Sequence, residues 1–219
     1  MRLFSNEGRS ANGIAVGISL IFLCLVNSLC ARAQPATVDP TFVANVSGGA
    51  VYKIALLSDG KILMYVTPGP GLVGGTNYTY VLSNGHYTLP ELRGSTVVTG
   101  RATLYVSGSA QPYTIVIRRE ASLDLYVAGA SASFGPVMNE NGNAVAFAYY
   151  GLPGNTNVSV HGNNFFAGTF YAPAAKVTFG GGGNDELDFS GAVVGRNIIV
   201  NAKMGVHYDE RLGVAGPEL

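Results

Sequence analysis

A short strand-like pattern returns about every 22 residues through the second half of the chain, and this recurrence limits the possible folds more than any other feature. The copies occupy 102–106, 122–127, 145–149 and 168–172. Their tyrosines lie 21, 23 and 22 residues apart, at Tyr105, Tyr126, Tyr149 and Tyr171. A near-constant period in this range indicates stacked repeats, because each unit buries its apolar side only against its neighbours.

Alternation of apolar and polar residues within the copies indicates β-strands. In 123–127 the carboxylate Asp124 shares a side with Tyr126, so the two leucines and the valine point inward. The same rule predicts inward apolar side chains on the other strands, namely Leu104, Val106, Ile115, Ile117, Val158, Val160, Val177, Phe179, Ile198 and Val200. For 144–149 the alternation leaves open which side is inner.

Additional strands are predicted between the tyrosine-bearing ones, near 113–117, 157–161, 176–179 and 197–200. Asparagine and glycine, which tolerate tight bends, mark the corners between them. No stretch shows a helical period with capping residues. We therefore expect an all-β fold, a right-handed parallel β-helix (solenoid) preceded by an N-terminal β-hairpin.

The composition excludes two classes of protein. The chain is 47% hydrophobic and only 12% charged, which argues against disorder. Its formal net charge is zero, so the sequence offers no basic surface for a nucleic acid, and we expect no nucleic-acid partner.

The N-terminal segment has the pattern of an export signal. Arg2 and Arg9 precede an apolar run over 14–29, which is followed by Ala31-Arg32-Ala33 and predicts cleavage before Gln34. An uncleaved anchor and lipidation at Cys30 are the alternatives. Both cysteines lie in this segment, so the mature chain would have no disulfide and no membrane span, and would be extracellular, at the cell surface or periplasmic.

The rest of the chain divides at changes in composition. An Asp-Gly turn at 58–61 joins predicted strands at 51–57 and 62–66 into a hairpin. Prolines and glycines in the next stretch predict a linker. The expected parts are a signal peptide (1–33), a hairpin region (34–66), a linker (67–76), the β-helix domain (77–213) and a tail (214–219).

The hairpin region resembles a single delta-sixty repeat. The resemblance rests on Asp39-Pro40-Thr41-Phe42, Gly49-Ala50-Val51-Tyr52 and Asp59-Gly60-Lys61-Ile62-Leu63. Such repeats usually occur in tandem in bacterial proteins, where they are thought to build propeller-like arrays. One copy cannot close a propeller, so we expect a hairpin packed against the solenoid.

The C-terminal part resembles an exported bacterial β-solenoid family of unknown function. The resemblance rests on the pattern YAPxA at 171–175, GAVVG at 191–195 and HYDExL at 207–212. It implies an extracellular structural module of surface, pilus-associated or adhesive character, without an established activity. The family-motif residues of unknown role are Ala172, Pro173, His207, Tyr208, Asp209 and Glu210.

Two polar clusters could carry chemistry. His207 and Asp209 would share one side of a strand, as a terminal cap or as part of a metal site, which needs three or four ligands. Asp185, Glu186 and Asp188 follow a glycine run, as a solvated loop or as a calcium site. We assign neither cluster a metal, and we expect no cofactor.

The third candidate is the tyrosine ladder formed by Tyr105, Tyr126, Tyr149 and Tyr171, with Asp124, Arg118, Arg119 and Glu120 nearby. It could stabilise the stack, bind glycans or belong to a polysaccharide lyase. No motif of a catalytic serine or a phosphate-binding loop is present, and we assign no catalytic residue. We expect a non-catalytic secreted or cell-surface structural or adhesive module, and alternatively a carbohydrate-binding or lyase-like protein. A surface glycan or another cell-surface protein would be its partner.

Overall fold

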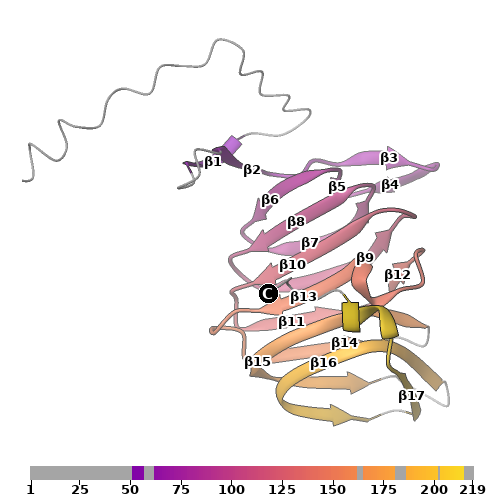
Figure 1. Ribbon diagram of the computed structural model, residues 1–219. Helices are drawn as coiled ribbons and strands as arrows, with labels where there is room; N and C mark the ends of the chain where they lie inside the picture. The colour runs from indigo at the N-terminus through magenta and orange to yellow at the C-terminus, as the bar shows by residue number, and fades with distance from the viewer. Residues whose placement is uncertain (1–50, 57–61, 162–164, 181–185, 202, 215–219) are drawn as a thin grey trace, which may run out of the picture. The chain divides into compact units, whose positions relative to one another are not determined.

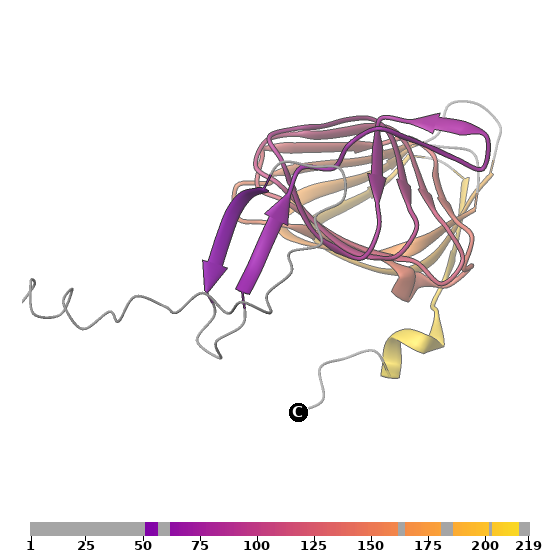
Figure 2. The ribbon, with the colours of Figure 1, turned by 90° about the horizontal axis from the view of Figure 1, so that it is seen from above.

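The computed structural model describes residues 51–56, 62–161, 165–180, 186–201 and 203–214. All of them belong to one compact unit that spans Val46–Leu219. This unit is a β-solenoid of about six turns, in which parallel strands of successive coils stack on one another (Figures 1 and 2). The expected solenoid fold is confirmed. The predicted signal peptide and the hairpin turn at 58–61 lie outside the described residues.

Strand pairing divides each coil into three faces, which we call A, B and C. Face A is a continuous parallel sheet. Its strands are β2 (Ile62–Val66), β6 (Gly85–Leu89), β8 (Arg101–Val106), β10 (Ser122–Val127), β13 (Phe147–Gly151), part of β15 (Phe166–Gly180) and part of β16 (Glu186–Val200).

Faces B and C follow face A along each coil. Face B contains the beginnings of β7 (Leu92–Val98) and β9 (Ala110–Ile117), then β11 (Ser131–Phe134), β14 (Asn157–His161) and the second parts of β15 and β16. Face C contains β5 (Tyr80–Leu82), the ends of β7 and β9, β12 (Val137–Asn139), and the start of β16 paired with β17 (Lys203–His207).

Two antiparallel hairpins precede the first complete coil. β1 (Val51–Leu56) pairs with β2, which confirms the predicted hairpin, and β2 joins face A by pairing Tyr65 with His86. β3 (Gly71–Val73) pairs with β4 (Thr76–Tyr78) where the sequence predicts a linker. Its turn is made by Gly74 and Gly75, both at positive φ, where glycine is the residue that adopts the conformation without strain.

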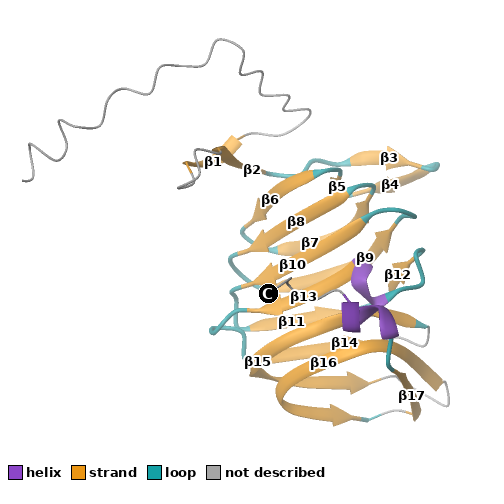
Figure 3. Ribbon diagram, viewed as in Figure 1, coloured by secondary structure: helices purple, strands orange, loops and turns teal. Residues whose placement is uncertain are grey.

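The described residues contain two helical segments, both short 3-10 turns, η1 (Ala144–Ala146) and η2 (Glu210–Val214). Figure 3 shows them near one another at one side of the stack, although 63 residues separate their ends. Neither these turns nor any other helix in the described ranges is long and apolar enough to cross a membrane.

Inward-pointing columns of apolar side chains form the core. The inward residues predicted on β8, β9, β10, β14 and β15 are all buried. The prediction was wrong for Ile198 and Val200, which are 50% and 48% exposed. Both stand in the expected columns, above Val177 and Phe179, but no later strand in the described residues covers them.

The core changes character along the stack. Leucine, isoleucine and valine fill the coils up to β10, and aromatic rings fill the later ones. Phe134 contacts three rings of the next coils edge-on, those of Phe147, Tyr149 and Phe170. Aromatic contacts of this kind add about 0.5–1.5 kcal/mol each beyond the burial of apolar surface.

One polar pair is fully buried inside this aromatic core. The Tyr149 hydroxyl donates to Asn155 Oδ1 at 2.9 Å, and Asn155 Nδ2 donates to the Gly129 carbonyl at 2.7 Å. Burial raises the pKa of Tyr149, and the hydrogen bond from Asn155 opposes this only in part, so the phenol stays neutral. Asn155 therefore makes a tyrosine acceptable in a core column by giving its hydroxyl an acceptor.

We expect Asn155→Ala to lower the free energy of unfolding by about 2–3 kcal/mol, because two buried polar groups lose their partner. Urea denaturation measures the change. The control is Asn157→Ala, since Asn157 is exposed and its amide contacts only Thr156. Equal stability of Asn155→Ala and the unaltered protein would contradict the role given to Asn155.

Candidate functional site

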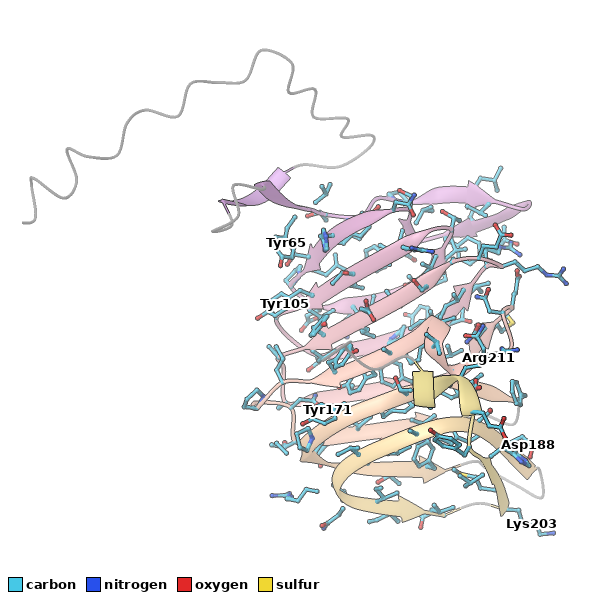
Figure 4. All side chains as sticks on the ribbon, viewed as in Figure 1. Tyr65, Tyr105, Tyr171, Asp188, Lys203 and Arg211 are labelled. Atoms are coloured by element: carbon cyan, nitrogen blue, oxygen red, sulfur yellow. The ribbon has the colours of Figure 1, made fainter. Side chains whose placement is uncertain are left out.

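The outward column of tyrosines on face A is the most regular surface feature of the described residues. Strand register aligns four tyrosines on successive coils, namely Tyr105, Tyr126, Tyr150 and Tyr171. Figure 4 shows the labelled Tyr105 and Tyr171 on the same side of the stack, together with Tyr65 from β2. The predicted ladder is therefore present, with one member changed.

Tyr149 was wrongly predicted as a member of this ladder. It pairs with Leu125 and Phe170 in an inward column and is 0% exposed, whereas Tyr150 points outward. The coil between β10 and β13 is longer than its neighbours, because it includes β12 and η1. A fixed period consequently falls one residue short of Tyr150. The only sequence signal was the Tyr149-Tyr150 pair itself, next to a stretch that is apolar on both sides.

The rings of the ladder are not equally available. Tyr126 and Tyr150 stack face to face, with centroids 4.6 Å apart and planes 13° from parallel. Each ring therefore covers one face of the other. Tyr171 is 53% exposed and stacks on no other ring among the described residues. An external ligand could contact the edges of the stacked pair and the open ring of Tyr171.

Asp124 controls the electrostatics of the ladder. It precedes Tyr126 by two residues on the same outward side and lies in register with Thr103 and Ala148. Partial burial of its carboxylate raises the pKa of Asp124. Desolvation, and then the Asp124 charge, raise the pKa values of Tyr126 and Tyr150. Both phenols therefore remain neutral donors around one carboxylate.

The charged residues predicted near the ladder lie at a corner instead. Arg118 Nη1 contacts Glu140 Oε1 on the next coil at 2.7 Å. Glu120 is the one described non-glycine residue at positive φ, and its N–H donates to Asn141 Oδ1 at 2.8 Å. The Asn141 amide also donates to the Arg118 and Ala121 carbonyls. This group closes the turn between faces C and A and does not join the tyrosines.

The HYDExL motif fastens the C-terminal turn to an earlier coil. Asp209 Oδ2 accepts a hydrogen bond from the Ala144 N–H at 2.8 Å, across 65 residues, and Oδ1 accepts one from the Arg211 N–H at 3.1 Å. The Ala144 bond is the main reason that the pKa of Asp209 is lowered. Asp209 thus connects η2 to the start of η1, a contact that the sequence did not indicate.

The rest of the C-terminal region is open to solvent. Asp209, Glu210 and Tyr208 line a shallow depression of about 360 Å³. His207 turns to Asp188, with Nε2 3.8 Å from Oδ1, and not to Asp209. Figure 4 shows Asp188 and Lys203 at the end of the stack and Arg211 farther along it.

The residues suggested for a metal do not converge where the structure describes them. No group of three or more His, Cys, Asp or Glu side chains suited to a metal ion occurs in the described ranges. Asp185 lies outside these ranges, and only the backbone of Glu186 is described.

The other family-motif residues occupy corners and tight columns. Ala172 is buried beneath the register shift where β15 turns from face A to face B, and Pro173 lies exposed in that turn. Gly191 has φ +150° at the corner between faces C and A, where a Cβ atom would overlap the Gly168 carbonyl. These residues allow neighbouring coils to approach closely.

Comparison with protein families matches residues 71–214 to a domain of unknown function, DUF7305. The chain belongs to the DUF7305 family. The matched region begins at β3 and includes every strand of faces A, B and C after β2. Comparison with curated proteins and with solved structures gives no match.

We expect Asp124→Asn to raise the melting temperature at pH 7. A raised pKa in the folded state means that ionisation of Asp124 favours the unfolded chain, so stability is lost as pH rises from below 3.8 through the folded pKa. The advantage of the variant should disappear below pH 3.8, where both chains are uncharged at this position. Differential scanning calorimetry across this pH range measures it.

The control for Asp124→Asn is Glu120→Gln, which removes an exposed carboxylate at a corner. We expect its effect on the melting temperature to be small at every pH. A decrease in the melting temperature of Asp124→Asn at pH 7 would contradict the assignment.

We expect Asp209→Ala to speed hydrogen exchange at the Ala144 amide by about tenfold, because that amide loses its acceptor. Asp209→Asn keeps an acceptor oxygen and should retain most of the protection. In the unaltered protein the protection should be complete above pH 3.8 and fall as pH drops through the lower folded pKa. Exchange measured by NMR or mass spectrometry tests this, and unchanged exchange in Asp209→Ala would contradict it.

Proposed function

We propose that this DUF7305 protein is an exported, non-catalytic structural and adhesive module of the cell surface. Its contact surface is face A. The observation that carries the proposal is the outward column of Tyr105, Tyr126, Tyr150 and Tyr171, which repeats at one register on four successive coils.

The chemistry of this column suits adhesion. Tyrosine supplies a rigid apolar ring and a hydrogen-bonding hydroxyl, and it loses little conformational entropy when it is fixed in a contact. The raised pKa values of Tyr126 and Tyr150 keep these hydroxyls as donors at neutral and moderately alkaline pH. A row of such groups on a stiff sheet supports many weak contacts at once.

The proposal of export rests on the N-terminal sequence. The apolar run over 14–29, followed by Ala31-Arg32-Ala33, has the order of a cleaved signal. Beyond Gln34 the sequence has no cysteine, so a mature chain would depend on stacked backbone ladders and side-chain columns for its stability.

Glycan binding is the second candidate, favoured by the open ring of Tyr171 and the carboxylate of Asp124 on the same face. A sugar ring could stack on Tyr171, and its hydroxyls could donate to Asp124. A lyase-like activity has less support. Among the described outward side chains of β8 and β10, Asp124 and Arg101 are the charged ones, and they lie on different coils.

The experiment measures retention of the purified protein on immobilised glycans and on intact cells. We expect a variant with Tyr126→Ala, Tyr150→Ala and Tyr171→Ala to lose retention by at least about tenfold, a loss that corresponds to about 1.4 kcal/mol of binding. Tyr113→Ala is the matched control, because Tyr113 is 78% exposed but lies outside the column.

The outcomes separate the candidates. Retention on defined glycans favours carbohydrate binding, and retention on cells without a glycan match favours the adhesive module. If the triple variant only melts at a lower temperature and binds as before, the ladder serves stability alone. Release of unsaturated uronates from an acidic polysaccharide would overturn the non-catalytic proposal.

A further inference from the structure

The last coil ends with an edge that no strand covers in the described residues. β17 pairs with 186–190 of β16, whereas 191–200 of β16 pair only with the preceding coil. Figure 1 shows β16 and β17 at this end of the stack. Unpaired edges expose backbone donors and acceptors and invite pairing with another chain.

The side chains at this end continue the core into solvent. The inward positions of the last coil are apolar, namely Val193, Ile198, Val200, Met204 and Val206. In the column of Ile198, the residues of the preceding coils, from Leu92 to Val177, are at most 2% exposed, but Ile198 itself is 50% exposed. Val200 is 48% exposed and Val206 is 64% exposed. A partner must therefore supply both a strand edge and apolar side chains.

The opposite end of the solenoid does not offer this surface. On face A, the first strand, β6, is already paired with β2. On face C, the Val81 N–H donates to the Gly69 carbonyl at 2.9 Å. Tyr80 and Tyr87 pack across the core there. Head-to-tail stacking of identical chains would have to displace these partners, so a contact between two identical C-terminal ends is favoured.

The spiral of the coil determines how two such ends fit together. A coil rises by one strand spacing, about 4.8 Å, in each turn, so face B ends about one third of this spacing beyond face A, and face C about two thirds. A two-fold axis through face B places face B against face B and face A against face C of the second copy. The rises then sum to the same value on all three faces, which no axis through face A or C achieves.

We propose that this end is a self-association surface, and that two copies of the chain pair tail to tail about a two-fold axis through face B. Residues 197–200 then form an antiparallel pair with their equivalents, and 191–195 pair with β17 of the second copy. Contact between identical patches closes as a dimer and leaves neither C-terminal edge exposed. The patch, 191–200 with β17, is near the lower limit for a stable interface, about 20 residues on each side.

Tail-to-tail pairing predicts that the full chain is a dimer, measured by analytical ultracentrifugation. Ile198→Lys should raise the dimer dissociation constant at least about tenfold, because it places a charge from each copy in the contact. Ile198 is already half exposed, so the variant should fold, which circular dichroism and the melting temperature check. Val200→Lys is a second variant at the same edge.

Ser159→Lys is the matched control, since it adds the same charge on face B but two strands before the edge. It should remain a dimer. The proposal is overturned by a monomeric unaltered protein, by open-ended larger assemblies, or by dimers that persist in both edge variants. Association through the N-terminal apolar segment would persist in this way. Binding to glycans or cells is measured separately and does not depend on the outcome.

Discussion

The hydrogen-bonded ladder between successive coils is the interaction on which the rest of the structure depends. Parallel pairing at a constant register places each residue directly over its equivalent in the preceding coil. Side chains therefore form columns, and each column must suit the environment of the whole stack. Leu104, Leu125, Tyr149 and Phe170 form one inward column. Every member of it is buried.

Polar and aromatic features follow from the position of each column. Tyr149 stands inward, so its hydroxyl needs Asn155 as a buried acceptor. Tyr150 stands outward on the adjacent position, so its ring stacks on Tyr126 near the charge of Asp124. Neighbouring residues of the same type thus have different roles, because successive side chains of a strand point to opposite sides. The outward column is the surface on which the proposed adhesion rests.

A ladder that grows coil by coil has two ends, and this protein treats them differently. The first coil is covered by the β1–β2 hairpin and by Tyr80 and Tyr87. The last coil leaves the apolar side chains of Ile198 and Val200 half exposed, and Asp209 fastens the chain that follows to Ala144 and not over that edge. The exposed edge is the physical basis of the proposed self-association.

Alternation and repeat period were sufficient to predict the β-solenoid, the hairpin, and the inward direction of residues such as Leu125 and Val177, because these depend on local strand geometry. Tertiary structure decided which residues meet. Corner segments differ in length, so pairing placed Tyr150 and not Tyr149 beside Tyr126. The contact of Asp209 with Ala144, and the exposure of Ile198, depend on where the chain leaves the stack, and no local pattern encodes that path.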